Sequence, residues 1–195
     1  MSRKSVVDRK TRETEIRLAL ELDGTGQYRV ETGVPFFDHM LESFAKHSLF
    51  DLELRAKGDL EVDLHHTVED VGIVLGQALR EALGSAEGIR RYGNFVLPMG
   101  EAKVEVAVDV SNRPYLVYRA ELANDRIGDF DASLVEDFLW AFAQNAGLDL
   151  HVEKRYGRSP HHVVEAVFKG VARALREAVE RDPRVEGVPS VKGTL

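Results

Sequence analysis

Two copies of a His-His-x-x-Glu motif carry the side chains best suited to chemistry in this 195-residue sequence. Residues four apart lie on one face of a helix, so the first histidine and the glutamate of each copy can bind one metal ion together. The second histidine is rotated by about 100° around the helix axis and should reach a different ion. The motifs therefore predict two metal sites. The candidate ligands are His65, His66, Glu69, His161, His162 and Glu165.

The two motifs belong to an internal repeat. When the first half of the chain is placed over the second, Phe44-Ala45 falls on Phe142-Ala143, and the motifs coincide after a small shift in the preceding loop. On the same alignment His39 falls on Asp137, so each half has one further candidate ligand on an earlier helix. A lone aspartate beside Glu136 is usually solvated, and the repeat alone makes Asp137 a candidate.

Helical geometry predicts two interleaved sites of four ligands each. Each site takes the earlier-helix ligand and the i,i+4 pair of one half, together with the second histidine of the other half. One ion is expected on His39, His65, Glu69 and His162, and the other on Asp137, His161, Glu165 and His66. The pattern is compatible with assembly within one chain and with assembly between chains.

The ligand types restrict the metal. The sequence has no cysteine, so a transition metal must be held by histidine nitrogen and carboxylate oxygen. Such a set suits Mn²⁺, with Fe²⁺ or Zn²⁺ as alternatives. One motif of this length is more often a capping or surface feature, but two copies at matching places favour metal binding. His151, on a predicted strand, is expected to pack or to support a ligand.

Apolar periodicity and turn signals predict the elements that position these side chains. Strands at 14–22 and 27–32, joined by the turn Asp23-Gly24-Thr25-Gly26, predict a β-hairpin. The first half continues with a helix at 36–46, a strand at 49–56 and a helix from His65 to before Gly84. The second half repeats this order with strands at 102–110 and 115–122, a helix at 131–145, a strand at 148–153 and a helix at 160–180.

The sequence thus predicts an α+β fold of two pseudo-symmetric strand-strand-helix-strand-helix halves, with sheets packed against helices. We expect a single catalytic domain over residues 1–195, with repeated halves at about 7–92 and 93–180 and a C-terminal tail at 181–195.

Composition argues against some partners. The formal net charge of -7 makes a general nucleic-acid or anionic-membrane surface improbable, although a small anionic substrate remains compatible with it. The N-terminus lacks the apolar core of a signal peptide, and no apolar run approaches the roughly 20 residues that span a bilayer. We therefore expect a cytoplasmic protein that binds neither nucleic acid nor membrane.

Several segments together resemble the imidazoleglycerol-phosphate dehydratase family over nearly the whole chain. They are Phe37-Asp38-His39-Met40, Asp63-Leu64-His65-His66-Thr67-Val68-Glu69-Asp70, Ser111-Asn112-Arg113-Pro114, His161-His162 with Glu165 and Phe168-Lys169, and Pro189-Ser190-Val191-Lys192-Gly193. The resemblance implies the monofunctional enzyme of histidine biosynthesis, two Mn²⁺ ions per active site, and a 24-subunit homo-oligomer with active sites shared between subunits. The chain departs from the family at Asp137, where many relatives have histidine, although a carboxylate can still bind Mn²⁺.

The resemblance also implies a reaction and residue roles. The reaction removes water from D-erythro-imidazoleglycerol phosphate to give imidazole acetol phosphate, and two ions beside the imidazole would favour its imidazolate form. Glu13 is the expected base for the carbon-bound proton, with Glu165 as the second catalytic carboxylate. The expected phosphate-binding residues are His47, Arg91, Arg113, Lys169, Ser190 and Lys192. Lys169 lies about two helical turns beyond His161, close to the same face, which supports its assignment on geometry.

Two other functions are compatible with these ligands. A dinuclear metallohydrolase could use them to activate water, and it should tolerate the loss of Glu13. A metal-stabilised structural protein would lose its assembly, but no lyase activity, when the metal is removed.

Overall fold

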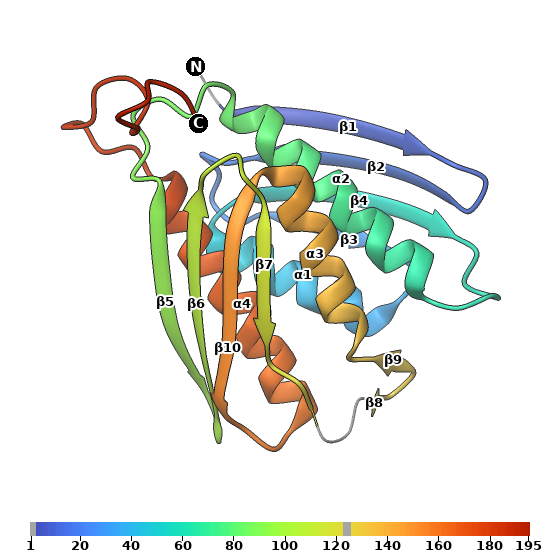
Figure 1. The fold of residues 1–195 in the computed structure, drawn as a ribbon. Helices are drawn as coiled ribbons and strands as arrows, with labels where there is room; N and C mark the ends of the chain where they lie inside the picture. Colours follow the sequence, from blue (N-terminus) through green and yellow to red (C-terminus); the bar gives the residue numbers. More distant parts are fainter. Residues whose placement is uncertain (1–2, 123–125) are drawn as a thin grey trace.

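Two halves make up the fold, and their elements follow the same order except for two short strands, β8 and β9, found in the second half alone (Figure 1). The computed structural model describes residues 3–122 and 126–195. The first half comprises β1 (Lys4–Lys10), β2 (Thr14–Glu21), β3 (Tyr28–Glu31), α1 (Pro35–Ser48), β4 (Asp51–Gly58) and α2 (His65–Leu83). The second half comprises β5 (Tyr92–Met99), β6 (Ala102–Val110), β7 (Tyr115–Arg119), β8 (Arg126–Ile127), β9 (Phe130–Asp131), α3 (Leu134–Ala146), β10 (Leu148–Tyr156) and α4 (Pro160–Val179). This order confirms the predicted α+β fold of two similar halves.

Each half begins with one strand more than the sequence predicted. Only Val7 is buried on β1, whose other apolar residue, Val6, is exposed, and β5 contains Gly93 and Pro98. Both strands lie at the edge of a sheet, where few side chains reach the core and the apolar alternation is correspondingly weak. Helix α3 begins at Leu134, after its predicted start, because residues 130–131 form β9.

The two sheets share one topology, and it differs from the predicted hairpin. Their strand orders are β1-β2-β4-β3 and β5-β6-β10-β7, with β3 parallel to β4 and β7 parallel to β10. The hairpin between 14–22 and 27–32 is therefore wrong, because β4 occupies the place beside β2. Asp51 at the start of β4 accepts hydrogen bonds from the backbone N–H groups of Thr25 and Gln27, each at 2.8 Å. This carboxylate holds the turn against β4 instead.

The helices lie between the two sheets (Figure 1). Helix α2 packs on β1 and β2, and α4 packs on β5 and β6. The helices also pair across the halves, α1 with α4 and α2 with α3. Phe138 of α3 contacts Phe37 of α1 and Phe168 of α4, with ring centroids 5.4 and 5.3 Å apart. The two halves therefore contribute to one continuous apolar core.

Two glycines of α2 allow α3 to approach closely. A Cβ atom added to Gly72 would lie 2.6 Å from the carbonyl oxygen of Phe138, and one added to Gly76 would lie 2.6 Å from that of Phe142. Any larger side chain at these positions would have to displace the backbone of α3. The two glycines therefore set the separation of helices whose first turns carry candidate ligands.

The segment after α4 folds back on the start of the second half. Gly88 donates its backbone N–H to the carbonyl of Gly187 at 2.8 Å and accepts from the N–H of Asp182 at 2.9 Å. No regular helix or strand follows α4 among the described residues, as the lack of periodicity predicted.

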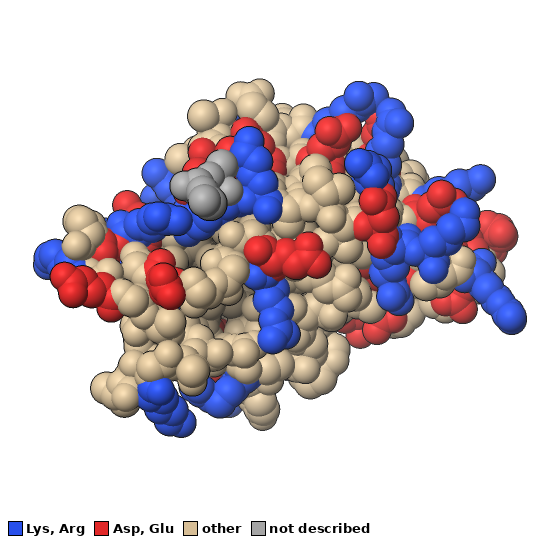
Figure 2. All heavy atoms as spheres, turned by 90° about the horizontal axis from the view of Figure 1, so that it is seen from above, with Lys and Arg blue, Asp and Glu red and all other residues tan. Residues whose placement is uncertain are grey.

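Charged side chains of both signs are interspersed on the face shown in Figure 2. None of the helices in residues 3–122 and 126–195 has the length and apolar character needed to cross a membrane.

Candidate metal centre

The candidate ligands lie in or beside the first turns of the four helices described in the chain. Pro35 and Pro160 occupy the first turns of α1 and α4, where a missing N–H costs no hydrogen bond. Ser159 caps α4 by accepting a hydrogen bond from the N–H of His162 at 3.4 Å, which agrees with the predicted helix start. At α2, Asp63 accepts from the N–H of His65 at 2.8 Å. These prolines and capping contacts define where α1, α2 and α4 begin, and the candidate histidines therefore lie near the N-terminal ends of the helices.

The first donor group comprises His39 of α1 with His161 and Glu165 of α4. Oε2 of Glu165 lies 3.1 Å from Nε2 of His161 and 3.9 Å from Nε2 of His39. Donor atoms of all three residues lie within 4.8 Å of one another. Two ligands of one ion, each about 2.0–2.2 Å from it, are themselves about 3–4.4 Å apart. The separations of 3.1 and 3.9 Å from Glu165 therefore fit a shared metal ion.

The second donor group comprises His65 and Glu69 of α2 with Asp137 of α3. Nδ1 of His65 lies 3.4 Å from Oδ2 of Asp137, and Nε2 of His65 lies 3.8 Å from Oε2 of Glu69. A carboxylate thus faces each nitrogen of the His65 ring. Since one ring nitrogen can serve a given ion, the side chains must turn before all three bind together, and this group is less preformed than the first.

The chain groups these ligands differently from the expected sites. His39 lies with the motif of the second half, and Asp137 lies with the motif of the first half. The predicted grouping of each with its own half is wrong because the helices pair across the halves. The second histidines, His66 and His162, join neither group within the described chain, so the expected mixed sets do not form inside one chain.

Each second histidine instead contacts a carboxylate that the sequence analysis missed. Nδ1 of His66 lies 3.0 Å from Oδ2 of Asp59, and Nδ1 of His162 lies 2.6 Å from Oε2 of Glu101. The hydrogen bond with Asp59 is the main cause of a raised pKa of His66. The hydrogen bond with His162 is the main cause that lowers the pKa of Glu101 to about 2. The partners are 7 and 61 residues apart in sequence, so no common spacing could have identified them.

Glu13 lies in the turn between β1 and β2, beside His66. Its Oε1 atom is 4.0 Å from Nε2 of His66, and its side chain is 54% exposed. Asp70, a buried carboxylate of α2, accepts a hydrogen bond from Nη2 of Arg9 at 2.9 Å and another from the hydroxyl of Thr14. Because Arg9 and Thr14 lie on the strands that flank the turn, Asp70 holds the turn in place and leaves the Glu13 carboxylate free.

Lys169 and His47 lie near the first donor group. Nζ of Lys169 is 2.5 Å from Oε1 of Glu165. Burial acts to raise the pKa of Glu165, but the hydrogen bond and charge of Lys169 and the neighbouring histidines outweigh it, and this pKa is lowered. The pKa of His47 is lowered, first by burial and then by the positive charges of Lys169 and Arg173. The structure therefore brings together two of the expected phosphate-binding residues.

The other expected phosphate-binding residues lie just before β5, in the second half and in the tail, and they are Arg91, Arg113, Ser190 and Lys192. Arg91 binds Asp109, with Nε 2.6 Å from Oδ1, and its Nη1 donates to the carbonyl of Pro189 at 3.0 Å. The hydrogen bond with Asp109 is the main cause of the raised pKa of Arg91. In the part of the chain that the structure describes, no hydrogen bond or ion pair joins these four residues to His47 or Lys169.

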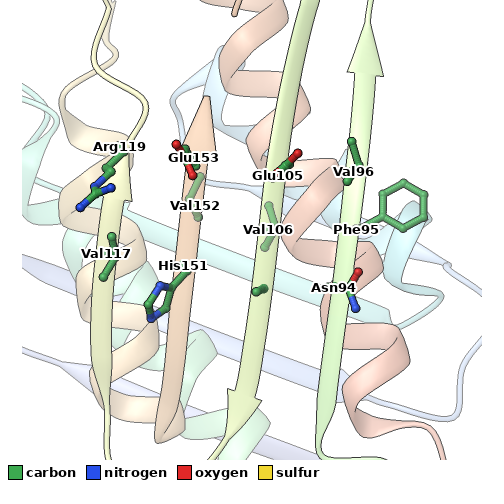
Figure 3. Close-up of a pocket in the computed structure, with 11 residues that line it drawn as sticks. Asn94, Phe95, Val96, Glu105, Val106, Val117, Arg119, His151, Val152 and Glu153 are labelled. Atoms are coloured by element: carbon green, nitrogen blue, oxygen red, sulfur yellow. The ribbon is translucent and has the colours of Figure 1, made fainter. Parts of the chain in front are cut away.

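His151 lies apart from the candidate ligands, on the face of the second sheet that Figure 3 shows. Its side chain is exposed and lines a hollow of about 340 Å³ formed by β5, β6, β7 and β10. The expected packing or ligand-supporting role of His151 is therefore wrong. The outward direction of alternate residues on β10 accounts for its position.

Comparisons with known proteins agree on one family. A family profile described as imidazoleglycerol-phosphate dehydratase matches residues 32–175. An imidazoleglycerol-phosphate dehydratase of Acetivibrio thermocellus is 57% identical over 195 residues, covering 100% of both chains. That of Symbiobacterium thermophilum is 59% identical over 189 residues, covering 97% of this chain and 91% of the relative. A crystal structure of the Staphylococcus aureus enzyme is 37% identical with a TM-score of 0.84, covering 92% of this chain and 99% of that chain.

Proposed function

The chain belongs to the imidazoleglycerol-phosphate dehydratase family, and from this membership we propose that it removes water from D-erythro-imidazoleglycerol phosphate to give imidazole acetol phosphate. The family acts in histidine biosynthesis. The observation that carries the proposal is the donor group of His39, His161 and Glu165, because these residues occupy the family motifs and lie within 4.8 Å of one another.

We propose that two Mn²⁺ ions bind per active site. The first would be held by the group of His39 and the second by the group of His65, with His66 and His162 each completing a site on a neighbouring subunit. The partly exposed positions of these two histidines, outside both groups of their own chain, support the sharing. Bound beside the imidazole of the substrate, the ions would stabilise its imidazolate form and so weaken the bond to the hydroxyl that leaves.

We propose Glu13 as the general base. Its carboxylate lies beside Nε2 of His66, which places it close to any substrate whose imidazole approaches that histidine. The exposure of Glu13 and the fixed turn around it suit a group that must take a proton from carbon and return it to solvent. Glu165 is the second catalytic carboxylate of the proposal, and Lys169 holds it ionised and oriented toward the imidazoles of the first group.

We propose that the substrate phosphate is bound by positive and polar groups supplied from two places. Lys169 and His47 lie beside the first donor group. Arg91 orients the tail through Pro189, which supports a role for Ser190 and Lys192, and Arg113 is the remaining candidate. Two separate sets could enclose one phosphate if neighbouring subunits contribute to one site, which agrees with a 24-subunit homo-oligomer in the cytoplasm.

Turnover and a single substitution test this function. Metal-loaded protein is incubated with imidazoleglycerol phosphate and Mn²⁺, and formation of the ketone is followed. Glu13→Gln should lower the rate about 10²–10⁴-fold, the range of general base catalysis. Glu15→Gln is the matched control, because Glu15 is exposed on the adjoining strand and pairs with Lys10. A metallohydrolase would release phosphate and tolerate Glu13→Gln, and absence of ketone from assembled, metal-loaded protein would contradict the proposal.

A further inference from the structure

We propose that Asp59 and Glu101 are positioning residues that fix the hydrogen of His66 and His162 on Nδ1, so that Nε2 of each ring presents its lone pair outward as a metal donor. The inference rests on the proposed function in one respect, that His66 and His162 are ligands. It adds two residues that act through these histidines and touch neither metal nor substrate.

Glu101 makes a short contact with His162, and backbone hydrogen bonds hold the Glu101 carboxylate in place. Oε2 of Glu101 lies 2.6 Å from Nδ1 of His162. Its other oxygen, Oε1, accepts hydrogen bonds from the backbone N–H groups of Ser159 at 2.7 Å and Arg158 at 3.3 Å. The carboxylate therefore bridges the turn between β5 and β6 and the start of α4. An ionised carboxylate only accepts hydrogen bonds, so Nδ1 of His162 must be the donor.

Asp59 makes the equivalent contact with His66. Its Oδ2 and Oδ1 atoms lie 3.0 and 3.2 Å from Nδ1 of His66. The carbonyl of Asp59 accepts a hydrogen bond from the N–H of Val62 at 2.8 Å, which closes a turn in the loop before α2. The Asp59 side chain is 21% exposed, so this is a partly enclosed contact.

The opposite nitrogen of each ring is free to bind a metal. Within residues 3–122 and 126–195, Nε2 of His162 has no hydrogen-bond partner, and Nε2 of His66 lies 4.0 Å from Oε1 of Glu13, beyond hydrogen-bond distance. A neutral imidazole with its hydrogen on Nδ1 has its lone pair on Nε2. Metal-bound histidines commonly donate their other N–H to a carboxylate in this way, which fixes both tautomer and ring orientation.

Asp59 and Glu101 do not occupy corresponding positions in the two halves, so the internal repeat alone does not account for both contacts. Glu101 lies in the turn between the first two strands of its half, and the corresponding turn of the other half carries Glu13. His66 takes its carboxylate from Asp59 instead, in the loop after β4. The same contact on Nδ1 therefore arises twice from unrelated positions. Because Asp59 holds His66, Glu13 is left free for proton transfer.

Binding of Mn²⁺ to the metal-free full-length protein tests the inference, with free Mn²⁺ followed by electron paramagnetic resonance. In Glu101→Gln the amide oxygen can still accept from Ser159, but the amide NH₂ faces Nδ1 of His162 and moves the ring hydrogen to Nε2. Asp59→Asn should act in the same way on His66. Each variant should bind Mn²⁺ about 10–100-fold more weakly at the affected site. Wild-type affinity in both variants would overturn the inference.

Matched controls separate positioning from a general effect on the fold. Glu61→Gln changes an exposed glutamate in the same loop as Asp59, and Glu105→Gln changes a partly exposed glutamate on β6 that pairs with Arg155, so neither should alter Mn²⁺ affinity. In a His162→Ala background, Glu101→Gln should cause no further loss, because Glu101 acts through that ring. An equal loss with and without His162 would overturn the inference.

Metal binding and turnover can fail separately. If the wild-type protein binds Mn²⁺ and the variants bind it weakly, but no ketone forms, the positioning inference stands and the proposed function fails. If the ketone forms and the variants bind Mn²⁺ as tightly as the wild type, the function stands and the inference fails.

Discussion

Replacing Gly76 with alanine should destabilise the protein and disturb its second donor group. The added Cβ would lie 2.6 Å from the carbonyl oxygen of Phe142, 2.8 Å from Cβ of Asn145 and 2.9 Å from the backbone nitrogen of Ala146. Cβ atoms essentially never approach other heavy atoms more closely than 3.0 Å. Two of these three obstacles are backbone atoms and cannot rotate away. Helices α2 and α3 must therefore move apart.

The expected loss follows from two opposing effects. Alanine is favoured over glycine in a helix interior by about 1 kcal/mol. Overpacking a close-packed interface costs about 1–3 kcal/mol, since the separated helices also lose dispersion contacts along their length. The upper part of the overpacking range applies, because two of the three obstacles are backbone atoms. We therefore expect a net loss of about 1–2 kcal/mol, which for a chain of this size lowers the melting temperature by about 3–6 °C.

Urea unfolding of the metal-free protein, followed by circular dichroism, measures this loss. Gly170→Ala in α4 is the comparison, because its added Cβ would meet a methyl group of Val106 at 2.8 Å instead of a backbone atom. Gly76→Ala should lose more stability than Gly170→Ala, and it should bind Mn²⁺ more weakly at the group of His65 and Asp137. A loss in Gly76→Ala equal to or smaller than that in Gly170→Ala would refute the reasoning.

Further outcomes are expected for three substitutions and for removal of the metal. Lys169→Met should lower the free energy of unfolding of metal-free protein by about 1–3 kcal/mol, because buried Glu165 loses its charged partner; an unchanged urea midpoint would contradict this. Asp51→Ala should cost about 1–3 kcal/mol at pH 7, because the backbone N–H groups of the 25–27 turn lose a charged acceptor. Burial acts to raise the pKa of Asp51, but the hydrogen bonds from those N–H groups outweigh it, and the pKa is lowered from its usual 3.8. The difference in stability between wild type and variant should therefore be complete above pH 3.8 and should shrink as the pH falls through the lowered pKa of the folded protein. A difference in urea midpoint that stays constant at acid pH would count against this. Removal of the metal by a chelator should abolish ketone formation, and added Mn²⁺ should restore it. The His39→Ala variant should retain one metal ion of each pair, as measured by metal analysis of the purified protein.

The sequence predicted the contact within one motif but not how the two motifs are grouped with the earlier helices. Helical spacing places His161 and Glu165 on one face, and the structure has them 3.1 Å apart. The partner of that pair, His39, could not be predicted by spacing, because its place depends on the packing of α1 along α4. The contact between Glu101 and His162 could not be predicted by spacing either, because it joins a turn and a helix that are distant in sequence.

The fold shows the same division between local and long-range information. The alternating apolar residues of β2 and the glycine-containing turn after it are local signals, and both elements are present. The pairing partner of β2 is not local, since β4 lies beside it in the sheet but is separated from it in sequence by β3 and α1. The edge strand β1 escaped prediction for another reason: with Val7 as its one buried residue, it has almost no apolar pattern to recognise.

The pairing of helices across the halves has a consequence for the origin of the chain. Residues of α1 lie beside the motif on α4, and those of α3 lie beside the motif on α2. In a polypeptide consisting of one half, the earlier-helix ligand and the motif would therefore each lack the partner that the other half supplies. Two copies related by a two-fold axis would satisfy both at once. Duplication and fusion of such a unit would turn a dimer interface into the interior of a single chain. Afterwards each copy could diverge alone, as the aspartate at position 137 opposite the histidine at position 39 illustrates.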